Sequence, residues 1–342
     1  MRKYIITTLI VTALSSLVLG QNSRMGSASS TQLLVVPSAR YLSGGGAAAT
    51  VTGMDAVFWN PAGLAMSENN IDAIFSNRTY IAEIDNSFFG VSTSLGENKF
   101  GLSIRTFNMG DIKETTVFYP DGTGQMFTPN FSVIGGSISR KLSENTSVGI
   151  NANIIRESFG TVSATGTAFD LGVQYKGLFG RENLDLGFVL KNFGQPVEYE
   201  GTGLGVFATS TDADRPEEYY LTDAAAFDLP FMFDMAISYD VAGATVGATY
   251  TSNYYSTDEI KLSAAYGLAG LATVRAGFQS SGKAQDAADV KEDWYTNPSD
   301  GVSFGASIDL SRFVGSNLSV DYSMLPMGDF GNNNIFSLRV GF

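Results

Sequence analysis

The chain has no cysteine and no histidine among its 342 residues, and these two absences exclude much of protein chemistry. Without cysteine, no disulfide can form. Without histidine, the Ser-His-Asp and Cys-His catalytic arrangements and histidine-ligated zinc sites cannot be built. No pair of carboxylates stands out by its spacing as an acid and a base. We therefore expect a protein that is not an enzyme and carries no metal or other cofactor.

Long apolar runs are also missing, except at the N-terminus. There, Arg2 and Lys3 precede an apolar run that ends at Gly20, which predicts a cleaved secretory signal peptide over residues 1–20. Beyond it, no stretch approaches the ~20 apolar residues that a membrane-spanning helix needs. Removing the signal peptide leaves 19 Lys and Arg against 34 Asp and Glu, and so acidic a chain is not expected to bind nucleic acid.

What the chain has instead is strict alternation of apolar and polar residues, most clearly at its C-terminus. A strand has a side-chain period of two, so one face of the last strand is apolar and ends on an aromatic. Arg339 lies on the other face, and an arginine facing lipid would cost roughly 2–4 kcal/mol, so this face is expected to line a lumen. The apolar face predicts a C-terminal signal for the barrel-assembly machinery and consists of Phe336, Leu338, Val340 and Phe342.

Fourteen such runs follow residue 70, most of them nine to twelve residues long, close to the ~9–11 that a tilted strand needs to cross a bilayer. They predict an all-β fold: a transmembrane antiparallel β-barrel of about 14 strands over residues 71–342, surrounded by outer-membrane lipid. A soluble sandwich or propeller also alternates, but such uniformly long strands are unusual there. The predicted strands are 71–79, 86–95, 98–107, 131–142, 146–156, 166–176, 183–193, 230–241, 244–251, 259–267, 271–279, 301–310, 317–325 and 334–342.

Short turns alternate with long loops along this barrel, as in outer-membrane barrels, whose short turns are periplasmic. Two of the loops, around 211–218 and 286–293, are acidic enough to hold Ca²⁺, but they lack the twelve-residue ligand pattern and are interpreted as solvated outer loops. The predicted long loops are 108–130, 157–165, 194–229, 252–258, 280–300 and 326–333.

Charges of both signs fall on the inward faces of the strands. They could line a hydrophilic pore, but buried charges demand partners, so we expect them to pair with one another and with whatever fills the lumen. The remaining inward positions are mostly glycine and serine. The predicted lumenal charges are Arg105, Asp170, Asp185, Lys191, Asp234, Lys261, Arg275, Asp309, Asp321 and Arg339.

Residues 21–70 do not alternate, and a barrel of about fourteen strands is too wide for its own side chains to fill. These residues are therefore predicted to form a periplasmic or lumenal hatch. Its most distinctive part is the motif Phe58-Trp59-Asn60-Pro61-Ala62-Gly63, in which Asn-Pro is a strong turn initiator. We interpret the motif as the corner between hatch and first strand rather than as a gate. Its two aromatics could either line a hydrophobic ligand path or pack against the wall.

This motif resembles that of FadL-type (OMPP1/FadL/TodX) outer-membrane barrels, whose N-terminal hatch carries Asn-Pro-Ala before the first strand. Pro37-Ser38-Ala39-Arg40, Gly122-Thr123-Gly124, Ile155-Arg156-Glu157 and Leu190-Lys191-Asn192-Phe193-Gly194 make the chain similar to the PorV/PorQ branch. The resemblance implies a fourteen-stranded barrel with a lumenal hatch. It also implies a role in type IX secretion, in which the barrel receives exported proteins with a C-terminal signal domain and hands them on.

Two functional hypotheses follow. The first is a PorV/PorQ-like component that binds type IX secretion partners and exported cargo proteins through its outer loops. The alternative is a FadL-like channel for uptake of small hydrophobic compounds such as long-chain fatty acids. A channel of that kind needs an apolar lumenal pocket, whereas the inward positions are mostly polar or small, which favours the first hypothesis. A purely structural partner in a larger complex would bind neither.

Overall fold

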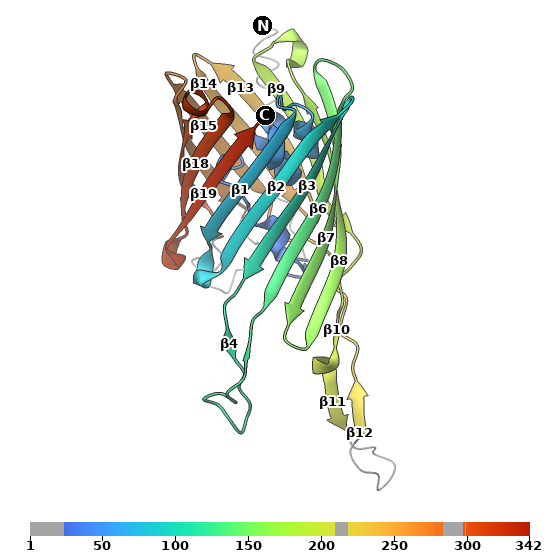
Figure 1. Ribbon diagram of the computed structural model, residues 1–342. Coiled ribbons are helices and arrows are strands. Elements are labelled where there is room, and N and C mark those ends of the chain that lie inside the picture. The colour runs from blue at the N-terminus through green and yellow to red at the C-terminus, as the bar shows by residue number, and fades with distance from the viewer. Residues whose placement is uncertain (1–23, 209–217, 283–296, 298) are drawn as a thin grey trace.

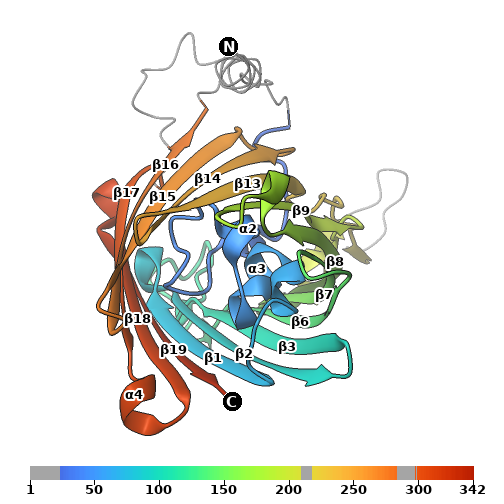
Figure 2. The same cartoon turned by 90° about the horizontal axis from the view of Figure 1, so that it is seen from above.

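In the computed structural model, fourteen antiparallel strands form one closed barrel (Figures 1 and 2). The structure describes residues 24–208, 218–282, 297 and 299–342, so the predicted signal peptide, most of the acidic segment 211–218 and all of the acidic segment 286–293 lie outside the described residues. The fourteen predicted strands are confirmed. They are β1 Ile71–Thr79, β2 Asp85–Leu95, β3 Asn98–Asn108, β6 Asn130–Lys141, β7 Thr146–Phe159, β8 Val162–Tyr175, β9 Leu184–Gly194, β13 Met232–Val241, β14 Ala244–Asn253, β15 Glu259–Leu268, β16 Ala272–Ser281, β17 Gly301–Asp309, β18 Asn317–Pro326 and β19 Asn332–Gly341.

The barrel closes where the first strand meets the last. β1 pairs with β19, with Phe75 opposite Leu338, and β8 pairs with β9 so that the ring has no free edge. Closure leaves every wall strand with two hydrogen-bonded neighbours, which satisfies the backbone groups of the whole wall. A sandwich or propeller is thereby excluded.

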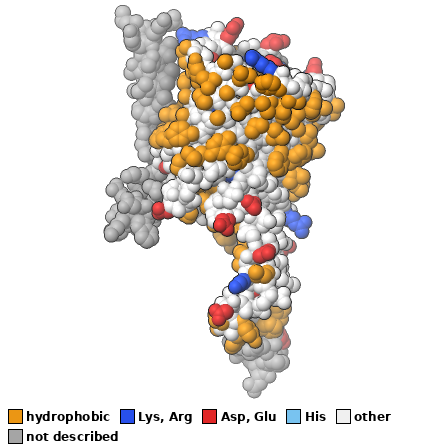
Figure 3. Space-filling model, turned by 60° about the vertical axis from the view of Figure 1, so that its left-hand side comes forward, with side chains coloured by type: hydrophobic (Ala, Val, Ile, Leu, Met, Phe, Trp, Pro, Cys, Tyr) orange, Lys and Arg blue, Asp and Glu red, His pale blue; other side chains and the backbone are white. Residues whose placement is uncertain are grey.

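Burial follows the predicted alternation. Phe75 and Phe336 are more than half exposed on the outside, whereas the inward-facing Ser76 and Asp321 are fully buried. Figure 3 shows the resulting apolar band on one face of the barrel, with the charged side chains of that face mostly beyond the band. Phe336 and Leu338 lie exposed on the outer face of β19, and Val340 has the same alternation as these two residues. Phe342, one residue beyond the strand, is also exposed. Among the described residues, no helix is both long and apolar enough to span a membrane.

The predicted long loop over 157–165 is wrong. β7 and β8 continue almost to their connection at Gly160 and Thr161, so this connection is a tight turn. The extended hairpin has partners that the local sequence does not reveal: β10 (Tyr199–Gly201) pairs with β8, with Tyr199 opposite Ala164.

Other connections project far beyond the barrel at the end opposite the C-terminus (Figure 1). They contain the hairpin of β4 (Ile112–Lys113) with β5 (Met126–Phe127) and that of β11 (Gly205–Ala208) with β12 (Glu218–Leu221). We call this end the long-loop end. The short turns, such as Ala242–Gly243 with both residues at positive φ, lie at the short-turn end beside the C-terminus.

Residues 24–70, here called the N-terminal segment, lie inside the ring of strands (Figure 2), and their end contacts show that they run from one end of the barrel to the other. At the long-loop end the Gly26 amide donates to the Tyr255 carbonyl at 3.1 Å, and at the short-turn end the Asn70 amide donates to the Phe342 carbonyl at 2.7 Å. Between them the segment forms five short helical turns: η1 Thr31–Leu34, α2 Ala47–Thr50, η2 Gly53–Asp55, α3 Ala56–Trp59 and η3 Pro61–Leu64.

Candidate functional site

The N-terminal segment lies against wall strands whose inward positions are glycine. A Cβ added to Gly172 would lie 1.9 Å from the Asn60 Oδ1 atom, and one added to Gly187 would lie 2.0 Å from the Ala48 carbonyl oxygen. At Gly149 the corresponding distance to the Pro61 carbonyl carbon is 2.3 Å. Real Cβ atoms do not approach so closely, so β7, β8 and β9 carry glycine here because the segment's backbone occupies the space of a side chain.

The Asn-Pro-Ala motif fixes this contact. The buried Asn60 amide nitrogen donates to the carbonyls of Ala48 at 2.7 Å and Val173 at 3.0 Å, while its Oδ1 accepts from the Ala62 amide at 3.1 Å. Pro61 begins η3, where its missing N–H costs nothing. Asn60 therefore caps the turn and ties it to the wall, and Ala62 and Gly63 are completely buried behind it.

A buried ion-pair cluster holds the opposite side of the segment. Arg339 on β19 pairs with Asp55 of the segment and with Asp321 on β18, and Arg40 of the segment approaches Asp321 at 3.2 Å. Ser38 donates a hydrogen bond to Asp55. Removing one partner of such a buried pair typically costs about 3–5 kcal/mol, because the other charge stays behind unpaired.

Sequence reasoning missed Asp55. It is the only acidic residue between Gln21 and Ser67, in a stretch of small and apolar residues, and an isolated carboxylate in such surroundings needs a cationic partner. That signal could have identified it. Its partner Arg339 lies 284 residues away, so the pairing itself could not be deduced.

A second group of lumenal charges surrounds the two motif aromatics. The Lys191 ammonium lies 4.1 Å from the centroid of the Phe58 ring and 5.3 Å from that of Trp59, and Arg105 lies 5.4 Å from the Phe58 ring. Asp170 accepts three hydrogen bonds from neighbouring amides. Lys261 pairs with Glu259 at 2.7 Å, and Asp234 is buried nearby.

The ten predicted lumenal charges thus fall into three places. Five lie around Phe58 and Trp59: Arg105, Asp170, Lys191, Asp234 and Lys261. Three belong to the ion-pair cluster or adjoin it: Arg275, Asp321 and Arg339. The remaining two lie near the short-turn end, where Asp185 pairs with Lys176 at 2.8 Å and the exposed Asp309 accepts from Ser311.

An outer cavity of about 480 Å³ lies on the long-loop side of these aromatics. Much of its lining is apolar, and it comes from the N-terminal segment and from the outer ends of the strands: Leu34, Val35, Val36, Leu42, Phe58, Trp59, Phe107, Phe131, Met232, Leu325 and Met327. The mostly polar or small inward positions of the strands therefore do not decide against an apolar pocket, because the N-terminal segment supplies part of the apolar lining.

The outer cavity also contains hydrogen-bond donors. Lys191 and Lys261 line it, and within the described part of the chain the indole nitrogen of Trp59 and the Nε atom of Arg78 are buried without a hydrogen-bond partner. An unpaired buried donor costs about 1–3 kcal/mol. The basic residues of the lining, Arg78, Lys191 and Lys261, outnumber its carboxylate Glu259 and favour a ligand that carries an acceptor, best an anionic one.

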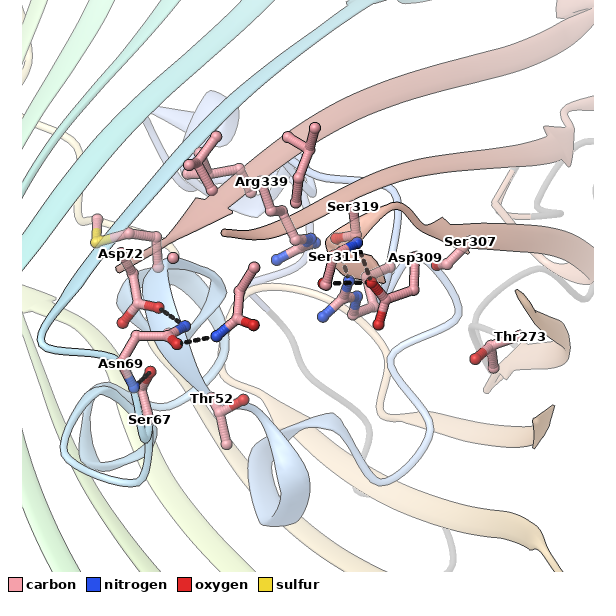
Figure 4. Close-up of a pocket in the computed structure, with 18 of the residues that line it drawn as sticks. Thr52, Ser67, Asn69, Asp72, Thr273, Ser307, Asp309, Ser311, Ser319 and Arg339 are labelled. Atoms are coloured by element: carbon pink, nitrogen blue, oxygen red, sulfur yellow. Dashed lines mark hydrogen bonds between the residues drawn. The ribbon is translucent and has the colours of Figure 1, made fainter. Parts of the chain in front are cut away.

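A polar inner vestibule of about 590 Å³ opens at the short-turn end (Figure 4). Figure 4 shows Thr273, Ser307, Ser319 and Arg339 of the wall on one side and Asn69 and Asp72 on the other. Arg40 and Arg275 also line it. The lumen therefore contains two chambers of opposite character, separated by the N-terminal segment.

The outer end of the segment has its own anchor at Glu157. This buried carboxylate accepts from Ser30 at 2.6 Å, from Gln32 at 2.7 Å and from the Tyr199 hydroxyl of β10. Burial, together with this hydrogen bond to a carboxylate, raises the pKa of the Tyr199 phenol above its usual range. The anchor explains why the β7–β8 hairpin extends beyond the predicted strand ends.

The fold is shared with solved channel and transporter proteins. A TodX mutant described as a monoaromatic hydrocarbon channel aligns with a TM-score of 0.53 and 13% identity over 86% of this chain and 96% of its own. The Ralstonia pickettii toluene transporter TbuX gives 0.52 and 12% identity over 87% and 96%, and a Pseudomonas aeruginosa FadL homologue gives 0.52 and 14% over the same shares. No protein-family model and no curated protein matches the sequence. At these identities the likeness shows that the chain has the fold of the FadL-type channels.

Proposed function

We propose that the protein is an outer-membrane channel that takes up small hydrophobic compounds. The observation that carries this proposal is the apolar outer cavity inside an otherwise polar barrel. Its volume lies within the range of ligand pockets, about 300–1,000 Å³. It faces the long-loop end, from which an external compound would arrive. The fold supports the proposal, because solved proteins with this fold are described as a monoaromatic hydrocarbon channel and a toluene transporter.

The donors in the cavity refine the substrate class. A fatty acid would place its carboxylate beside the Lys191 ammonium and its chain against Leu34, Val36 and Leu42, whereas an aromatic hydrocarbon offers that ammonium no acceptor. Hydrogen bonds to charged groups contribute about 1.5–3 kcal/mol. An amphipathic carboxylate therefore fits this cavity better than a pure hydrocarbon does.

The proposed location is the outer membrane. The apolar band of Figure 3 would contact lipid, and the apolar face of β19 would be read by the barrel-assembly machinery. In this proposal residues 21–70 serve as the hatch and 71–342 as the barrel.

Transport of this kind involves no covalent chemistry. The described residues contain no carboxylate cluster that could hold a metal ion.

Reconstituted liposomes test the function directly. The purified protein should bind long-chain fatty acids with a change in tryptophan fluorescence and should accelerate their entry. Trp59→Phe should remove most of the fluorescence response, and Phe89→Leu, on the outer wall, is the matched control because its side chain is half exposed and faces away from the lumen. Absence of both binding and uptake with fatty acids and with toluene would refute the proposal.

The projecting hairpins support a second candidate, the PorV/PorQ-like role. Val117, Phe118 and Phe207 expose 95%, 88% and 71% of their side chains at the long-loop end, which suits contact with another protein. This candidate predicts that exported proteins with a shared C-terminal domain copurify after mild crosslinking. It also predicts that deleting residues 112–127 abolishes that copurification while leaving fatty-acid binding unchanged.

A further inference from the structure

Arg78 is a buried cation without a partner in the part of the chain that the structure describes. It is the penultimate residue of β1, and only 4% of its surface is exposed. Its guanidinium makes no hydrogen bond and no ion pair with any described residue, and its Nε atom is completely enclosed. A buried charge without a partner is strongly unfavourable, so Arg78 favours an acceptor from outside the chain.

The other cations of the outer cavity are compensated within the chain. Lys261 pairs with Glu259 at 2.7 Å, and Lys191 lies within electrostatic reach of the buried Asp234. Among the described residues, no carboxylate comes within such reach of Arg78. Arg78 is therefore the position in this cavity where an external anion would compensate the least balanced charge.

Arg78 and Lys191 lie on opposite walls of the outer cavity, which both of them line. Between β1 and β9 the ring contains five strands on one side and seven on the other, so the two strands lie nearly across the barrel from each other (Figure 2). Fourteen strands spaced by ~4.8 Å and tilted by about 40° give a barrel roughly 28 Å wide between opposite backbones. A single carboxylate therefore cannot contact both cations.

The lining between these two cations is largely apolar. Val36, Leu42 and Phe58 contribute to it from the N-terminal segment. An apolar chain can pack against these side chains and meet a positive charge at each of its ends. A substrate with one carboxylate would pair with one cation and leave the other buried beside its apolar tail.

Arginine suits the binding of a second acidic group. Its planar guanidinium presents N–H donors in a fixed fork that binds a carboxylate or phosphate through two parallel hydrogen bonds. The centroid of the Tyr80 ring lies 4.5 Å from the guanidinium carbon of Arg78, and this cation–π contact holds the fork in place without using its donors.

We infer that Arg78 forms a second oxyanion subsite in the outer cavity, and that the channel prefers two-headed substrates, which carry an acidic group at each end of an apolar chain. One carboxylate binds the Lys191 ammonium and the other binds the Arg78 guanidinium. Long-chain dicarboxylic acids are the simplest members of this class. The inference rests on the proposed transport function and narrows its substrate class from one acidic group to two.

A pair of matched ligands tests the inference. A monocarboxylic and a dicarboxylic acid with the same number of carbon atoms are titrated into the purified full-length protein in detergent, at a pH where every carboxyl group is ionised. The best-fitting dicarboxylate should bind about 10- to 100-fold more tightly, the range expected for one more hydrogen bond to a charged group. Because its ends are held on opposite walls, its affinity should pass through a maximum as the chain is lengthened.

The outcomes separate this inference from the proposed function. Equal affinities for the two acids at every chain length would overturn the inference and leave the proposed function intact. Failure of both acids and of toluene to bind would refute the proposed function as well.

Variants assign the effect to Arg78. Arg78→Gln should lower the affinity for the dicarboxylate to that for the monocarboxylate, whose own affinity should stay unchanged. Arg140→Gln is the matched control, because it removes an exposed ion pair with Glu97 at the short-turn end and should change neither affinity. Equal losses for both acids in Arg78→Gln would mean that a single acidic group binds there, which overturns the two-headed class.

Two further measurements exclude other roles for Arg78. Without ligand, Arg78→Gln should unfold at the same temperature as the unchanged protein or at a higher one, because it removes an unpaired buried charge. A clearly lower unfolding temperature would reveal a structural partner and overturn the inference. Acetate added to the unchanged protein should not strengthen monocarboxylate binding; if it did, a separate small anion would occupy the subsite, and the two-headed class would be wrong.

Discussion

Replacing Gly172 by alanine should loosen the N-terminal segment, although alanine is ordinarily the better residue in a strand. The new Cβ would lie 1.9 Å from Asn60 Oδ1, so the amide must move and lose its hydrogen bonds to the Ala48 and Val173 carbonyls. Overpacking should destabilise the closed segment by about 1–3 kcal/mol, and the loss of two hydrogen bonds by about 1 kcal/mol each. Replacing glycine by alanine stabilises a strand by about 0.5–1 kcal/mol. The net destabilisation of the closed segment is therefore about 2–4 kcal/mol.

Native-state proteolysis measures this effect. Trypsin cleaves after Arg40 only when the segment opens, and where opening is fast the cleavage rate follows the population of the open form. A cost of about 2–4 kcal/mol predicts cleavage about 30- to 1,000-fold faster, since 1.4 kcal/mol is a factor of ten.

The matched control is Gly136→Ala on the outer face of β6. Within the described residues no atom lies within 4 Å of its added Cβ, so the substitution should leave the cleavage rate unchanged or slightly lower. Similar cleavage rates in Gly172→Ala and Gly136→Ala would refute the argument that the segment's backbone requires glycine in the wall.

Three further predictions follow from the same contacts. Lys191→Met should weaken fatty-acid binding about 10- to 100-fold in a fluorescence titration, because one hydrogen bond to a charged group is lost. Toluene binding should stay unchanged. Equal losses of affinity for both ligands would contradict the proposed carboxylate site. Asp55→Asn should destabilise the segment by about 3–5 kcal/mol in the same proteolysis assay, whereas Glu97→Gln, which breaks an exposed pair, should cost less than about 1 kcal/mol. Glu157→Ala should leave Ser30, Gln32 and Tyr199 without their shared acceptor. Amide hydrogen exchange should then become faster at residues 30–34 but not at residues 60–64. Exchange at residues 30–34 as slow as in the unchanged protein would show that the outer anchor is dispensable.

The strands and their faces were predictable from the sequence. Side-chain period is a local property of the extended backbone, so Phe336 and Arg339 were assigned to opposite faces of β19 without knowledge of any neighbour. The same logic placed Asp170, Lys191 and Asp321 in the lumen. It failed at the β7–β8 hairpin, where β10 and the buried Glu157 extend the strands through contacts with distant residues.

The character of the lumen was not predictable in this way. The inward glycines appeared in the sequence only as small residues, and only the folded chain shows that Asn60, Pro61 and Ala48 take the place of their side chains. The outer cavity likewise combines Trp59 and Val36 with Met232 and Leu325, which no local pattern connects.

The sequence by itself therefore determined a barrel of fourteen strands with an apolar outer face, because alternation, strand length and turn residues act over a few neighbouring positions. The tertiary structure decided where the lumen is sealed and where it is apolar. These properties depend on which distant surfaces meet, as Asp55 meets Arg339, and on the volume left between them, which closure of the ring around the N-terminal segment sets.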